Sequence, residues 1–168
     1  MLASTSVKLV AVSLLIAGSA GFHTGPARPA LYRIDLQPTE VGGGARAVAK
    51  LTMAPSPFGI SLTPDGHFLF DVELSVTGLP AASAGAHATY VAWATDDNLA
   101  AVRKLGTVRD GQTIKGQVDY NKFILLITAE RDAGVAHWQG PVVLRGLSAS
   151  MYLDNFSGKT FFNNGVPQ

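Results

Sequence analysis

The feature that most constrains the fold is a two-residue alternation of apolar and polar side chains. It is clearest in HFLFDVELSV (67–76), where every second side chain is apolar and the intervening positions include Asp71, Glu73 and Ser75. The stretch ARAVAKLTM (45–53) follows the same rule. Successive side chains of a β-strand point to opposite faces. This period therefore predicts strands with one face in a core and the other in water.

Turn sequences separate these runs. TPDG (63–66) has proline and glycine where a type I turn prefers them, and RDGQ (109–112) is typical of a β-hairpin. KFILLITAE (122–130) is apolar on both faces, which predicts a central strand covered on both sides. We expect one all-β domain over residues 31–146, an antiparallel β-sandwich of the immunoglobulin-like type. Its predicted strands are 31–36, 45–53, 58–62, 67–77, 88–95, 101–108, 112–118, 122–130 and 141–145.

The adjacent carboxylates Asp96 and Asp97 lie between two of these strands. A calcium-binding loop needs several further oxygen ligands at set spacing, and the neighbouring residues lack them. Aspartate also favours turns, because its side chain accepts hydrogen bonds from nearby backbone amides. We expect a turn here, although residues 96–106 also match one or two turns of helix.

The amino-terminal segment predicts export. Lys8 precedes a mostly apolar, uncharged run of 14 residues (9–22), and small residues around Ala20 offer a cleavage site. This run is shorter than the roughly 20 residues that a membrane-spanning helix needs. We expect a signal peptide or an uncleaved signal anchor at residues 1–22, followed by a linker at residues 23–30, with a buried amino-terminal helix as the alternative. An export signal predicts a domain on the periplasmic side of the membrane.

Charge and composition disfavour several functional classes. The 13 Lys and Arg residues nearly balance the 12 Asp and Glu residues and form no basic stripe, which argues against nucleic-acid binding. The absence of cysteine excludes disulfides, thiolate metal sites and a cysteine nucleophile. GLSAS (146–150) ends in serine where a nucleophile elbow requires glycine. We expect no enzymatic activity and no bound cofactor; a hydrolase built on an acid pair is the least favoured alternative.

The histidines offer a weak case for a metal site. No two of them have the spacing that places both on one face of a strand or helix. Only the fold could gather them, and imidazole would then suit copper or zinc. The candidate metal ligands are His67, His87 and His137.

The carboxyl-terminal tail, residues 147–168, is rich in aromatic side chains and lacks a clean period. We expect either a strand or wrap that completes the sheet, or an apolar segment that docks on another protein. A tryptophan in a predicted loop is a further exposed candidate. The candidate partner-binding residues are Trp138, Met151, Tyr152, Phe156, Phe161 and Phe162.

Residues 90–146 resemble the extracytoplasmic, carboxyl-terminal domain of bacterial anti-sigma-K factors. The segments that carry the resemblance are YVAW (90–93), KLGTV (104–108), KFILLITAE (122–130) and GPVVLRG (140–146). The resemblance implies a β-sandwich outside the cytoplasm. It does not extend to the part of that family that binds a sigma factor, because only residues 1–7 precede the basic residue of the apolar run.

These observations predict a non-enzymatic, exported β-sandwich that acts as a structural or protein-binding accessory subunit of a membrane-associated complex. A membrane-extrinsic subunit of a photosynthetic reaction-centre–antenna assembly is one example. Membrane contact is expected through residues 9–22 if the signal is uncleaved. The alternative is a periplasmic module that binds a small ligand or a metal such as copper or zinc.

Overall fold

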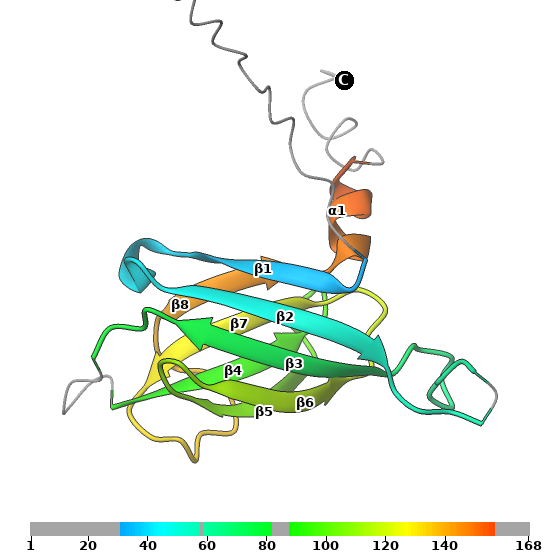
Figure 1. The fold of residues 1–168 in the computed structure, drawn as a ribbon, viewed down its shortest axis with the longest axis horizontal. Coiled ribbons are helices and arrows are strands. Elements are labelled where there is room, and N and C mark those ends of the chain that lie inside the picture. The colour runs from blue at the N-terminus through cyan, green and yellow to red at the C-terminus, as the bar shows by residue number, and fades with distance from the viewer. Residues whose placement is uncertain (1–30, 58, 82–87, 157–168) are drawn as a thin grey trace, which may run out of the picture.

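The chain folds as an antiparallel, all-β domain (Figure 1). The computed structural model describes residues 31–57, 59–81 and 88–156. A short 3-10 helix, η1 (Glu40–Gly42), and an α-helix, α1 (Ala149–Phe156), accompany the strands. The strands are β1 (Arg33–Pro38), β2 (Arg46–Met53), β3 (Phe70–Thr77), β4 (Thr89–Thr95), β5 (Val102–Val108), β6 (Thr113–Val118), β7 (Ile124–Glu130) and β8 (Val142–Leu147).

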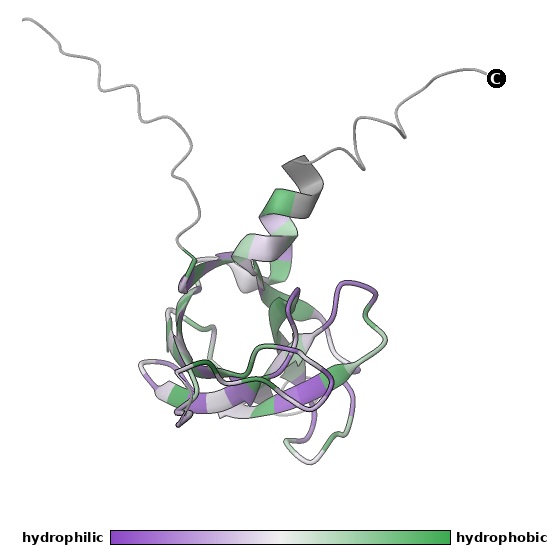
Figure 2. Cartoon of the chain, turned by 90° about the vertical axis from the view of Figure 1, so that its right-hand side faces the viewer, coloured by the Kyte–Doolittle hydropathy of each residue, from purple (hydrophilic) through white to green (hydrophobic). Residues whose placement is uncertain are grey.

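All eight strands belong to one sheet, in the order β5-β4-β7-β8-β1-β2-β3-β6. The sheet curls until its two edge strands lie side by side, and Figure 2 shows the nearly closed ring that results. No ladder joins β5 to β6 in the part of the chain that the structure describes. Instead, Leu105 of β5 packs closely against Gly116 of β6, where an added Cβ would lie 3.0 Å from Cδ2 of Leu105. The two edges therefore shield each other from further strand pairing.

The alternating side chains fill the interior of this ring. Leu74 and Val76 of β3 meet Leu125 and Ile127 of β7 in one core cluster, to which the other strands also contribute. The prediction of an all-β antiparallel domain is confirmed. Strand β7 lies between β4 and β8 and is buried on both faces, as its doubly apolar sequence predicts.

The two predicted turns are confirmed by their hydrogen bonds. The amide of Gly66 donates to the carbonyl oxygen of Thr63 at 2.9 Å, and the amide of Gln112 donates to that of Arg109 at 3.1 Å. Gly66 has a φ of 80°, a conformation that costs glycine little and other residues more. The turn at 63–66 lies beside the antiparallel bridge between Leu62 and Phe68. The β-hairpin predicted from RDGQ is wrong, because β5 and β6, which flank the turn at 109–112, share no ladder in the described part of the chain and form the two edges of the sheet.

Two elements differ from the sequence prediction. The expected strand at 58–62 is wrong, since only an isolated bridge between Leu62 and Phe68 forms there. Pro55 and Pro57 lie just before it and cannot donate to a ladder. As far as residue 156, the tail adds no strand after β8; from Ala149 it forms α1, whose sequence ASMYLDNF contains good helix formers such as alanine, methionine and leucine.

Candidate interaction surface

One end of the barrel carries nearly all of the large apolar side chains that the described residues expose. We call it the α1 end. It comprises the start of β1, the loop 54–69, the turn 96–101, the segment 119–123 and the helix α1 (Figure 1). Figure 2 looks onto this end. The described part of the chain exposes eight large hydrophobic residues. Seven of them lie at this end, and they are Leu31, Tyr32, Ile60, Leu62, Phe68, Leu99 and Leu153.

The described residues of the loop 54–69 (54–57 and 59–69) are held by hydrogen bonds although they form no strand. The amide of Leu69 donates to the carbonyl oxygen of Ser61 at 3.0 Å, and the amide of Phe68 donates to Oδ1 of Asn121 at 2.8 Å. The Phe68 ring also lies 6.1 Å from that of Phe70, centroid to centroid. Because a network holds the loop, its exposed apolar side chains are pre-positioned.

The turn between β4 and β5 is held by Asp96. Its Oδ1 accepts hydrogen bonds from the amides of Ala100 and Ala101, at 2.8 and 3.2 Å. The interpretation of Asp96 as a turn residue is therefore confirmed. Leu99, at the tip, has a φ of 60° and an exposed fraction of 51%. A left-handed conformation costs a non-glycine residue about 1–2 kcal/mol, so the Asp96 hydrogen bonds help to hold Leu99 in a strained, exposed position.

The helix α1 contributes part of the tail that the sequence proposed for docking. Ala149 is buried at its start, Met151 and Tyr152 are half-buried, and Leu153 is exposed. Phe161 and Phe162 lie outside the described residues, as does the side chain of Phe156. The sheet and its packing extend past residue 146, because Leu147 ends β8 and Ser148 is buried.

Trp138 lies at the opposite end, in the loop 131–141 between β7 and β8, and it is half-buried. Its ring packs edge-on against that of Trp93, with 6.3 Å between the centroids. Together with Val135 it covers a second apolar cluster on the outer face of the sheet, around Val91 and Leu126. Trp138 is therefore a packing residue rather than the exposed side chain that its loop position suggested.

A buried carboxylate fastens this loop to the sheet. Glu130 is 2% exposed, and its oxygens accept hydrogen bonds from the amides of Gln139 and Gly140, at 3.2 and 3.1 Å. The indole of Trp93 donates to the hydroxyl of Thr128, which in turn donates to Glu130. Sequence reasoning missed this network; the available signal was one carboxylate ending a strand that is otherwise apolar on both faces.

The two candidate metal ligands that the structure describes do not come together. His67 lies in the loop 54–69 at the α1 end, whereas His137 lies in the loop 131–141 at the opposite end. His87 lies outside the described residues. Among the described residues, no three His, Cys, Asp or Glu side chains are grouped as a metal site would require.

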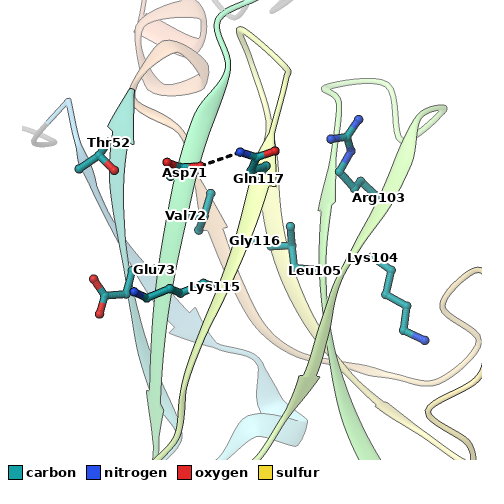
Figure 3. Close-up of a pocket in the computed structure, with 10 residues that line it drawn as sticks. All are labelled: Thr52, Asp71, Val72, Glu73, Arg103, Lys104, Leu105, Lys115, Gly116 and Gln117. Atoms are coloured by element: carbon teal, nitrogen blue, oxygen red, sulfur yellow. Dashed lines mark hydrogen bonds between the residues drawn. The ribbon is translucent and has the colours of Figure 1, made fainter. Parts of the chain in front are cut away.

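A shallow groove of about 580 Å³ runs over β3, β6 and β5 (Figure 3). Most of its lining is polar, and its charges have nearby partners: Nε2 of Gln117 donates to Asp71 at 2.8 Å, and Glu73 is opposite Lys115 in the strand register. Small-molecule sites are usually lined by apolar and aromatic side chains with a few polar groups. This groove has the character of a solvated sheet face.

Comparisons with protein-family models, with curated proteins and with solved structures found no match to this chain. None of the helices in the described residues is long and apolar enough to span a bilayer.

Proposed function

We propose that the protein is a non-enzymatic, exported accessory subunit that binds a protein partner in a membrane-associated complex through the α1 end. The observation that carries this proposal is the asymmetry of the barrel: of the eight large hydrophobic residues that the described part of the chain exposes, seven lie at one end. Scattered apolar side chains are normal on protein surfaces, but their concentration in one region is typical of an interaction surface.

The position of Leu31, the first residue that the structure describes, supports an association with the membrane. Leu31 belongs to the α1 end, and the linker of eight residues at 23–30 joins it to the apolar run at 9–22. Eight extended residues span at most roughly 28 Å. With the run retained in the bilayer, the α1 end stays close to the membrane and to any partner embedded there. With the run cleaved, the same end is free to bind.

The resemblance to anti-sigma-K factors supports the same type of domain. We propose that the two halves of the sheet, β1-β2-β3-β6 and β8-β7-β4-β5, correspond to the two layers of an immunoglobulin-like sandwich. Side chains from both halves meet in one core, which is the packing that a sandwich requires. Such domains present surfaces at the ends of their strands, where loops gather.

Native electrophoresis of solubilised membranes from the source organism tests this function. The tagged full-length chain should migrate in a large complex. The double variant Leu62→Asn/Leu99→Asn should shift it towards the free form, whereas Val41→Asn should not. Val41 is a matched control, because it is 51% exposed, as Leu99 is, but lies in η1 at the opposite end. Migration of the wild type as a free monomer would contradict the proposal.

A further inference from the structure

We infer that the partner surface met by the α1 end is a protein surface with an apolar centre and basic residues around it, and not an anionic membrane surface. This inference rests on the proposed function for the choice of the docking end. The choice of a basic protein surface over an anionic membrane rests on the charge of that end, because acidic side chains lie among the exposed apolar ones.

The acidic residues of the α1 end occupy the same turns as its apolar residues. Asp65 lies between Leu62 and Phe68, and Asp97 lies two residues before Leu99; both aspartates are exposed. Docking an apolar side chain at either turn therefore brings a carboxylate to the interface.

Among the described residues of this end, most of the carboxylates form no ion pair. The salt bridges among the described residues join Arg33 to Asp35 at 2.8 Å and Arg103 to Asp119 at 2.6 Å. The aspartates at positions 65, 96 and 97 form no salt bridge within the described part of the chain. Lys122 is the one cationic residue of the described loops and turns at this end. The two ion pairs aside, the described side chains of this end are therefore net negative, with three carboxylates against one cation.

An end of the domain that lies close to the membrane can meet either a lipid surface or a partner protein. An apolar surface with negative charge interacts differently with these two. Anionic headgroups attract Lys and Arg by about 1 kcal/mol each and repel carboxylates. A protein surface with Lys or Arg around an apolar centre offers the complementary potential. Basic partners are therefore favoured and anionic lipid is disfavoured by the same side chains.

The geometry of the turns makes this charge available without a large ordering cost. Asp65 belongs to the turn closed by the hydrogen bond from Gly66 to Thr63, and Asp97 follows Asp96 in the turn that Asp96 fastens. Pre-ordered loops lose little conformational entropy on binding. Charges at the edge of an interface act mainly on association rate and on salt dependence.

The test compares two double charge reversals in the full-length chain. Asp65→Lys/Asp97→Lys changes the α1 end, and Glu40→Lys/Glu73→Lys makes the same charge change elsewhere, at exposed positions on η1 and β3. Native electrophoresis measures the fraction of each protein in the complex at low and at high salt. Thermal unfolding confirms that both variants fold.

The first reversal should lower the complex-bound fraction roughly tenfold at low salt, because like charges then face each other, and the second should leave it unchanged. High salt should weaken wild-type binding. A photocrosslinker at Leu99 should join peptides that contain Lys or Arg near the linked residue, and one at Val41 should not.

Three outcomes would overturn the inference. One is that the reversal at 65 and 97 leaves the complex-bound fraction unchanged, or raises it, while Leu62→Asn/Leu99→Asn still releases the protein; the proposed docking function then survives. Another is that the wild-type protein floats with phosphatidylglycerol vesicles but not with phosphatidylcholine vesicles. A third is that neither the apolar nor the charge variants release it, in which case the docking function fails as well.

Discussion

The two ends of the barrel differ in the exposure of their apolar side chains. At the α1 end, Leu62 and Leu99 are more than half exposed, at 54% and 51%, although hydrogen-bonded loops fix their positions. At the opposite end, the loop 131–141 folds back over the sheet and covers the apolar cluster around Trp93. Within the described residues, the chain therefore covers an apolar face with its own loop at only one end. The proposed function assigns the cover of the α1 end to another molecule.

The loop 131–141 requires the backbone of Gly140 to lie close to that of Ala129. We therefore expect the largest loss of stability from a substitution at Gly140. A Cβ at this position would overlap the carbonyl oxygen of Ala129, in β7. Gly140→Ala should therefore lower the free energy of unfolding by roughly 3 kcal/mol, the cost of overpacking a tight site. Gly134→Ala in the same loop is the control, because a Cβ there makes ordinary contacts only. Equal denaturation midpoints for the two variants would contradict this account of the loop.

A smaller loss of stability is expected when the buried carboxylate of Glu130 is replaced by an amide. Glu130→Gln replaces an acceptor oxygen with an NH₂ group facing the amides of Gln139 and Gly140, so that donors oppose donors. The cost of a buried donor without a partner is about 1–3 kcal/mol. Hydrogen exchange of the Gln139 and Gly140 amides should accelerate, and the exposed Glu73→Gln on β3 should change neither stability nor exchange. Unchanged protection of the two amides would show that Glu130 does not fasten the loop.

At the α1 end, the loss of one hydrogen-bond acceptor should lower the stability by a smaller amount. Asp96→Ala removes the acceptor of two backbone hydrogen bonds in the turn that carries Leu99. We expect a loss of about 1 kcal/mol, together with weaker partner binding, because Leu99 is no longer held in place. Asp97→Ala has no such bonds to lose, so its unfolding free energy should stay within roughly 0.5 kcal/mol of the wild type. An equal loss of stability for both variants would refute the distinct role of Asp96.

The smallest effect concerns two tyrosines, one at each end. Burial raises the pKa of Tyr90, whose hydroxyl donates to the carbonyl oxygen of Pro80 at 2.9 Å. Burial, and then the charge of Asp119, raise the pKa of Tyr120. A folded-state pKa above the unfolded value of about 10 means that the folded chain keeps its proton while the unfolded chain loses it. Stability should therefore be constant below that pH and fall above it.

Single substitutions show how much each tyrosine contributes to the loss of stability at alkaline pH. Tyr90→Phe and Tyr120→Phe should each flatten the dependence of unfolding free energy on pH above about pH 10, measured by chemical denaturation at a series of pH values. A slope that neither substitution changes would assign the loss to other groups.

Much of the fold could be predicted from the sequence, because side-chain alternation depends only on which face a residue occupies. Eight of the nine predicted strands form, and the turns at 63–66 and 109–112 have their expected hydrogen bonds. The closure of the sheet could not be predicted, since it depends on the packing of Leu105 against Gly116 across two consecutive strands that share no ladder in the described part of the chain. The two-residue alternation of side chains does not by itself specify which strands lie at the edges of the sheet.

The candidate surface was harder to predict than the fold. Leu62 and Leu99 carry no signal of exposure in the sequence, and their location at one end follows from the strand order. Trp138 was a reasonable candidate for an exposed residue because loops are usually on the surface. The partner for its ring, Trp93, is 45 residues away in sequence, on β4. Long-range contacts of this kind decide which loop residues are available to bind.

The most direct test of the two-ended account is side-chain footprinting by hydroxyl radicals, comparing the free protein with the protein in its membrane-associated complex. We predict that Leu62, Phe68, Leu99 and Leu153 lose reactivity in the complex, while Val41 and Trp138 react equally in both states. Protection of Val41 and Trp138 with no change at the α1 end would contradict the account.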